Sequence, residues 1–193
     1  MTDAAATKPS SPKRDQLLDT AWRLFYRDGY HAVGIDTILA EAGVAKMTLY
    51  NHFASKDELI AAVLEKRHQE FVGALNAALE KSGKTGAKRL LAVFDWLEEW
   101  MTSPGFNGCT FIRAVAEYPR AEERPHVVAA EHKQWVIDYL AELARAASLK
   151  DPASLGRQLA LVMEGAIVTA HTFGAKRVGR LARESAQRLI GAS

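Results

Sequence analysis

Apolar residues recur with a helical period along almost the whole chain, and this repetition constrains the fold more than any other sequence feature. Between residues 13 and 28, for example, Leu17, Leu18 and Ala21 fall on one stripe, with charged side chains largely opposite. Alternating strand patterns are missing throughout. Gly29 and Gly43 follow the first two apolar stripes, where glycine can end a helix because it tolerates a left-handed backbone. We therefore predict an all-α protein.

The breaks in this pattern set the expected organisation of the chain. Predicted helices cover residues 13–28, 35–42, 46–52, 55–81, 88–101, 110–117, 125–147, 152–172 and 178–190. The long helix at 55–81 has the clearest start, because Ser55-Lys56-Asp57-Glu58 matches a capping box. Short helices precede it and longer ones follow. We predict a flexible N-terminal arm at 1–12, a compact unit at 13–56 and a larger helical bundle at 57–193.

Composition and the distribution of apolar residues exclude several classes of protein. A bilayer span needs about 20 consecutive apolar residues, whereas uninterrupted runs such as Leu90–Phe94 and Leu159–Met163 contain five. Met1–Pro12 is small and polar where a secretory signal needs an apolar stretch. Cys109 is the single cysteine, and the six histidines show no ligand spacing. We expect a cytoplasmic protein with no membrane partner, metal or cofactor.

The net charge of +2 gives little indication of a nucleic-acid partner. Residues 8 to 68 include nine basic and eight acidic residues. Binding of DNA must therefore depend on where individual cations are placed rather than on bulk basicity.

The segment from Ile35 to Leu59 carries the chemistry. Two short helices joined by a tight glycine turn at Gly43 have the outline of a helix-turn-helix, whose second helix enters the DNA major groove. Its apolar positions suffice to pack the two helices against the first one. The outward face then keeps Lys46, Met47, Thr48, Tyr50, Asn51 and His52. Hydroxyl, amide and ammonium groups are those that reach phosphates and base edges. The alternative is an ordinary helical hairpin with a polar surface.

Two stretches resemble the TetR (tetracycline-repressor-like) family of transcriptional regulators. They are AGVAKMTLYNHFASKDEL at residues 42–59 and AWRLFYRDGY at residues 21–30, and the likeness extends over about residues 13–65. The resemblance implies a homodimer whose N-terminal helix-turn-helix heads, at 13–56, bind double-stranded DNA at a pseudo-palindromic operator. It also implies that 57–193 is a ligand-binding and dimerisation domain with a small-molecule effector.

The resemblance also implies individual DNA contacts. Thr48 and Tyr50 match residues that contact phosphates or bases, Lys56 matches a phosphate contact, and Lys46 and Met47 match positions that vary with operator sequence. The full set of DNA-contact candidates is Thr37, Lys46, Met47, Thr48, Tyr50, Asn51, His52 and Lys56. The sequence departs from the family pattern at Ala45, where a capping serine is common, at Met47, where a small residue is frequent, and at Asp36, where some relatives have a cation.

The bundle offers candidates for an effector pocket and for a dimer contact. Most of its aromatic residues are expected in the core, with some lining a pocket for an apolar or aromatic effector. The pocket candidates are Trp96, Trp100, Phe111, Trp135, Tyr139 and Met163. Small residues at 156, 160, 166 and 170 would allow close helix approach, so the dimer candidates are Leu159, Met163, Ala166 and Ala170. Glu164 fits either a ligand contact or a pair across the dimer.

These features favour a dimeric, sequence-specific DNA-binding regulator, a repressor released by a small hydrophobic or aromatic effector. A small helical enzyme is the first alternative, but the chain has no GxSxG, Walker or GxGxxG motif, and we expect no enzymatic activity. A helical protein-binding adaptor is the second alternative. It would need another explanation for the polar and aromatic face from Lys46 to His52.

Overall fold

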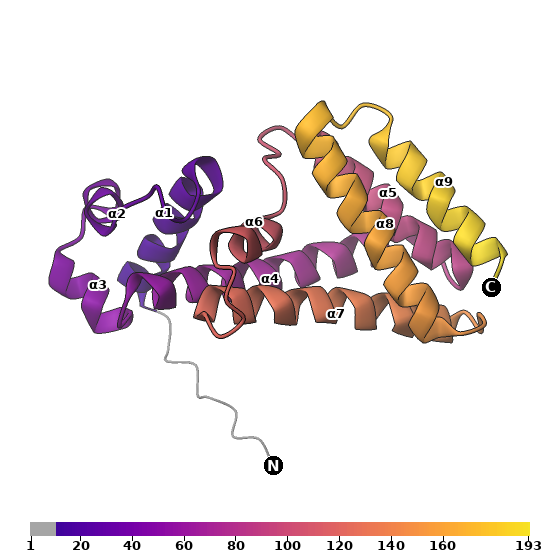
Figure 1. Ribbon diagram of the computed structural model, residues 1–193, viewed down its shortest axis with the longest axis horizontal. Helices are drawn as coiled ribbons and strands as arrows, with labels where there is room; N and C mark the ends of the chain where they lie inside the picture. The colour runs from indigo at the N-terminus through magenta and orange to yellow at the C-terminus, as the bar shows by residue number, and fades with distance from the viewer. Residues whose placement is uncertain (1–10) are drawn as a thin grey trace, which may run out of the picture. The chain divides into compact units, whose positions relative to one another are not determined.

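A computed structural model describes residues 11–193, and within this range all regular structure is helical (Figure 1). The helices are α1 (Pro12–Asp28), α2 (Ile35–Ala42), α3 (Lys46–His52), α4 (Lys56–Ser82), α5 (Ala87–Thr102), α6 (Thr110–Glu117), α7 (Arg124–Ala146), α8 (Pro152–Phe173) and α9 (Val178–Gly191). The predicted all-α class is confirmed. None of these helices is both long and apolar enough to cross a membrane. The chain forms two compact units, one ending at Val63 and one from Leu64 to Ser193.

Helix α1 begins earlier than its apolar stripe indicates. Ser11 is its N-cap, and the Ser11 hydroxyl accepts a hydrogen bond from the backbone amide of Arg14 at 3.2 Å. Pro12 follows in the first turn, where the missing amide hydrogen carries no penalty. The predicted arm at 1–12 therefore includes one residue of a cap and one of a helix. The rest of that arm lies outside the described residues.

The first unit is held together by apolar side chains of its three short helices. Leu17 and Leu24 of α1, Ile38 of α2 and Leu49 of α3 are all fully buried. The Gln16 side chain adds a hydrogen bond of 2.9 Å to the carbonyl of residue 42, at the end of α2. These contacts fix α3 as the second helix of a helix-turn-helix.

The turn between α2 and α3 depends on a single glycine. Gly43 has φ +62° and ψ +34°, the left-handed conformation that glycine adopts without steric cost. No heavy atom lies within 4 Å of a Cβ built on Gly43, so backbone conformation rather than space explains the residue.

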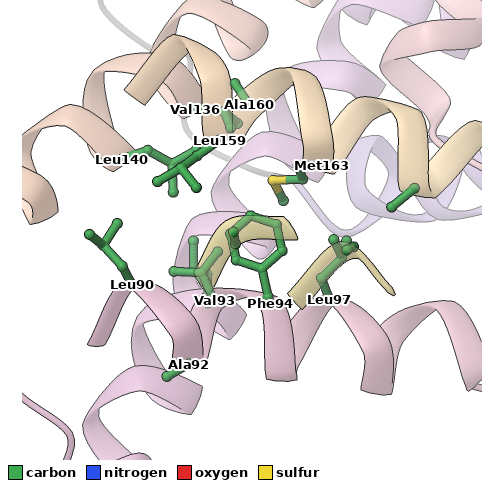
Figure 2. Close-up of a cluster of buried hydrophobic side chains, with 14 of the residues drawn as sticks. Leu90, Ala92, Val93, Phe94, Leu97, Val136, Leu140, Leu159, Ala160 and Met163 are labelled. Carbon is green, nitrogen blue, oxygen red and sulfur yellow. The ribbon is translucent and has the colours of Figure 1, made fainter. Parts of the chain in front are cut away.

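The second unit is a bundle whose core lies between α5, α7 and α8, with α9 packed against α5 and α8. Figure 2 shows side chains of α5 meeting side chains of the other two helices. Those labelled are Leu90, Ala92, Val93, Phe94 and Leu97 from α5, Val136 and Leu140 from α7, and Leu159, Ala160 and Met163 from α8. Each large buried side chain contributes about 1.5–3 kcal/mol to folding.

An ion cluster adds to the contact between α5 and α9. The Asp95 carboxylate accepts hydrogen bonds from Lys84 Nζ at 2.8 Å and from Arg183 Nε at 2.6 Å. Burial alone would raise the pKa of Asp95, but the hydrogen bonds from these two cations lower it below its ordinary value. The cluster therefore favours the ionised carboxylate and ties α9 to α5.

The small residues of α8 serve the packing of this chain against itself. Gly156 lies so close to α7 that an added Cβ would be 2.8 Å from the backbone nitrogen of Ala141 and 2.9 Å from the carbonyl oxygen of Ile137. A close helix approach at Gly156 thus occurs between α7 and α8 of one protomer.

We expect Gly156→Ala to destabilise the protein by about 1–3 kcal/mol, because the new methyl group overlaps backbone atoms that cannot move freely. Gly73→Ala is the matched control, since Gly73 is also inside a helix but has no atom within 4 Å of its Cβ position. It should stabilise by about 0.5–1 kcal/mol through helix propensity. Urea unfolding measures both, and equal effects of the two substitutions would contradict the tight contact.

Candidate functional site

Helix α3 presents a continuous exposed face. Lys46, Met47, Tyr50 and Asn51 are exposed, and Met47 retains 70% of its accessible surface. Leu49 faces inward and anchors the helix. An ammonium group, a thioether, a phenol and an amide therefore lie side by side on one surface. These groups can bind phosphates, contact thymine methyl groups and read base edges in a major groove.

Two of the departures from the family pattern, Ala45 and Asp36, lie at or near the start of α3. Ala45 is the N-cap and makes no side-chain hydrogen bond to the helix. Asp36 of α2 lies 3.7 Å from Lys46 Nζ, and both side chains are well exposed. An exposed pair of this kind contributes little, so a phosphate can displace the carboxylate from Lys46.

The other predicted DNA contacts surround this face. Thr37 is exposed on α2, and Thr48 is half-buried on α3. His52 is half-buried, and its Nε2 lies 3.3 Å from the Ser11 hydroxyl, which joins the end of α3 to the start of α1. Lys56 begins α4, and its Nζ donates to the carbonyl of residue 31 at 3.5 Å. The structure thus assembles all eight candidates in the first unit, with His52 and Lys56 also contacting other parts of that unit.

The predicted pocket residues of the bundle pack against one another. Trp96 stacks with Trp100 at 6.3 Å between ring centroids, and Trp135 stacks with Tyr139 at 4.8 Å. Trp135, Tyr139 and Met163 border a space too small for a water molecule. Phe111 is buried in a stack with His132. An effector among these residues stays a prediction, and it requires the cluster to open.

Two histidines lie inside this aromatic region. The Nδ1 atoms of His68 and His132 are 3.0 Å apart, within hydrogen-bond distance. His132 is 4% exposed, and the Phe111 ring covers its face at 3.5 Å. Burial lowers the pKa of His132 from 6.5 to about 2, with smaller contributions from Lys133 and His68. Burial also lowers the pKa of His68.

We expect the folded state to lose stability as pH falls below about 6.5. Below that pH the His132 side chain is protonated in the unfolded chain but stays neutral in the folded protein, so protonation favours unfolding. Above that pH the free energy of unfolding has its full value, and it should fall by about 2 kcal/mol between pH 7 and pH 5. Urea unfolding at several pH values measures it. His132→Phe keeps a ring against Phe111 and should flatten the dependence, whereas Gly73→Ala, which changes no titratable group, should leave it unchanged. An unaltered slope in the first variant would contradict this assignment.

The bundle also contains an open cavity of about 480 Å³ between α6, α7 and α8. Its walls are apolar: Ile112, Val115, Val136, Ile137, Ala160 and Leu161. Three charged side chains, Lys133, Arg157 and Glu164, complete the lining. None of the predicted pocket residues lines it. Sequence reasoning missed Lys133 and Arg157, although Arg157, Leu161 and Glu164 have the i, i+4, i+7 spacing of one helix face.

Lys133 and Glu164 form a half-buried ion pair at 2.7 Å, and Lys133 Nζ also lies 3.4 Å from Cys109 Sγ. Burial alone would lower the pKa of Lys133, but its contacts with Cys109 and Glu164 outweigh burial and raise it. Glu164 therefore pairs within its own chain. Cys109 is a partly buried free thiol in contact with a cation.

The predicted dimer residues face the interior of the protomer. Leu159, Met163, Ala166 and Ala170 are all buried in the bundle core, so a dimer contact through them would require that core to open. A dimer contact through these four residues stays a prediction, and other faces of the bundle are exposed. Among the described residues, large exposed apolar side chains occur only on α3, α8 and α9: Met47, Tyr50, Leu161, Val168, Phe173 and Leu181.

Comparison with known proteins agrees with this architecture. Residues 17–63 match the family model of bacterial regulatory proteins of the tetR family. SCO4454, a TetR-family transcriptional regulator from Streptomyces coelicolor, has a similar structure with a TM-score of 0.86 and 35% sequence identity. That match covers 93% of this chain and 95% of the other. A tetr-transcriptional regulator (sav143) from Streptomyces avermitilis is similar at a TM-score of 0.82 and 32% identity, over 94% and 98% of the two chains.

Part of the chain is also similar in sequence to a transcriptional activator. The chain is 40% identical over 93 residues to the HTH-type transcriptional activator FasR of Mycolicibacterium smegmatis. That match covers 47% of this chain and 42% of the relative, which is less than half of either protein.

Proposed function

Because the chain belongs to the TetR family of bacterial regulatory proteins, we propose that it is a cytoplasmic, homodimeric repressor that a small apolar effector releases from a pseudo-palindromic operator. The chain is a helix-turn-helix DNA-binding regulator of transcription. The exposed face of α3 carries the proposal. The buried Leu49 anchors α3 on its inner side. The opposite side exposes Lys46, Met47, Tyr50 and Asn51, which are therefore available to bind another molecule.

The exposed apolar residues of α8 and α9 support dimerisation. Val168 is exposed on α8, and Leu181 is exposed on α9, which packs against α8. Contiguous apolar residues on a surface mark interaction sites. One α3 helix contacts too few base pairs for a specific site, and two heads spaced by about 34–36 Å, or a multiple, would read two half-sites.

Helix α4 supports a link between effector and operator binding. It is continuous from Lys56, beside the DNA-contact candidates, to Ser82 in the bundle, and therefore belongs to both units. An effector that changes the position of α4 would change the separation of two α3 helices in a dimer. The coupling must be reciprocal: a ligand that weakens operator binding tenfold, about 1.4 kcal/mol, is itself bound tenfold more weakly by the DNA complex.

A mobility-shift experiment tests the proposal. The full-length protein should retard a duplex from upstream of its own gene in the presence of excess unrelated DNA, and should not retard a coding fragment of equal length. Equal retardation of both fragments would contradict sequence-specific regulation. A reporter fused to the retarded fragment separates repression from activation, the role in the name of FasR. Reporter output should rise when the gene for this protein is deleted.

A further inference from the structure

The cavity between α6, α7 and α8 has an uneven charge. Lys133 and Glu164 pair at 2.7 Å and compensate each other. Arg157 also lines the cavity and is exposed, and it makes no ion pair with any residue from 11 to 193. The lining is therefore an apolar surface with one uncompensated guanidinium group.

We propose that this cavity binds a small amphiphile with an apolar body and a carboxylate, and that Arg157 binds the carboxylate. A volume of about 480 Å³ lies within the range of small-molecule sites, which are mostly apolar with a few polar groups that orient the ligand. A guanidinium group binds a carboxylate through two parallel hydrogen bonds. The inference rests on the proposed function in one respect, the effector control of operator binding.

Ligands of other charge fit this lining less well. A neutral ligand would fill the same apolar walls but would leave Arg157 without an anionic partner. A cationic ligand would be repelled by Arg157, and its one possible counterion, Glu164, already accepts a hydrogen bond from Lys133. Charge complementarity therefore selects the anion among molecules of the same size.

The Lys133–Glu164 pair acts as a positioning element. Arg157 and Glu164 are seven residues apart on α8 and share a face, so an unpaired Glu164 would compete with the ligand for the guanidinium group. Lys133 on α7 holds the Glu164 carboxylate at 2.7 Å. This contact leaves Arg157 available to the ligand.

Titration calorimetry on the full-length protein without DNA tests the site. The probes are decanoate, decanol and decyltrimethylammonium, because they share an alkyl chain and differ in charge. The two ions are used below their micellar concentrations and decanol below its solubility limit. We expect one decanoate per chain, bound about tenfold or more tightly than decanol, as a charge-assisted hydrogen bond to arginine provides.

Arg157→Gln should remove the preference for decanoate over decanol while leaving decanol binding unchanged. Arg145→Gln is the matched control, because Arg145 is another exposed arginine of the bundle that does not line the cavity. It should keep the preference. Thermal unfolding followed by circular dichroism verifies that both variants fold.

Several results would overturn the inference: equal binding of decanoate and decanol, tightest binding of the cationic probe, or the same loss in Arg157→Gln and Arg145→Gln. Absence of any binding in a dimeric protein would also overturn it, and would indicate that a second copy covers the cavity. Operator binding is measured separately by fluorescence anisotropy. Decanoate that binds through Arg157 without changing operator affinity supports the site and contradicts effector control, since a ligand with equal affinity for both states shifts nothing.

Discussion

The double substitution Val168→Arg with Leu181→Arg should convert the protein to monomers and weaken operator binding by about 100-fold or more. Both side chains are exposed, so the substitutions leave the core of each protomer intact. Arginine at these positions places like charges and polar groups in the proposed contact between copies. A monomer loses the avidity of two linked heads, which amounts to about 10²–10⁴.

Sedimentation velocity and fluorescence anisotropy measure the two effects on the same samples. The matched control, Ala77→Arg with Ala146→Arg, adds the same charge at exposed positions of α4 and α7. It should remain dimeric with unchanged operator affinity. A wild-type protein that sediments as a monomer at micromolar concentration, or a dimeric double variant, would refute this dimer surface.

The second large effect is expected from salt. Cations that neutralise DNA phosphates release condensed counterions, so log affinity should fall linearly with log salt concentration. With about 6–10 phosphate contacts in a dimer, operator affinity should drop by about 10³–10⁵ between 50 and 200 mM salt. The modest net charge of +2 does not weaken this expectation, because the contacts come from local cations of the first unit.

Lys56→Ala should reduce the slope of that plot by about 0.9 for each head and weaken binding to all sequences alike. Lys150→Ala removes an exposed cation from the bundle and should leave the slope unchanged. Anisotropy titrations at five salt concentrations give the slopes. A Lys56→Ala effect confined to one base position would instead assign sequence reading to Lys56.

Local signals explain why the helices could be predicted closely. Gly43 ends α2 through its own backbone conformation, and the Ser55 hydroxyl accepts from the Glu58 amide at the start of α4, as the capping box predicts. The apolar periodicity predicts a later start for α1 than the structure has, because Ser11 and Pro12 are not part of the apolar stripe. A capping serine followed by proline is nevertheless a signal that a sequence contains.

Tertiary contacts explain what could not be predicted. The small residues of α8 indicate that another helix comes close, but only the fold reveals that this partner at Gly156 is α7 of the same chain. Leu159 and Ala166 consequently lie in the core, and Leu161 and Val168 take the exposed side. The aromatic residues of the bundle pack against one another in this structure, a contact that their sequence positions alone do not specify. The cavity forms between three successive helices, so the helical spacing of Arg157, Leu161 and Glu164 places them on one face of α8 but does not show that Lys133 of α7 meets that face.

Selection from randomised duplexes tests most directly whether the exposed face of α3 reads DNA sequence. Wild-type protein should enrich an inverted repeat with two half-sites one helical turn or a multiple apart. Met47→Ala should change the preferred bases at one position in each half-site, because Met47 is 70% exposed on that face. Lys56→Ala should enrich the same repeat as the wild type, with lower affinity. Recovery of unrelated sequences without a common repeat, or an unchanged motif in Met47→Ala, would contradict sequence reading by this face.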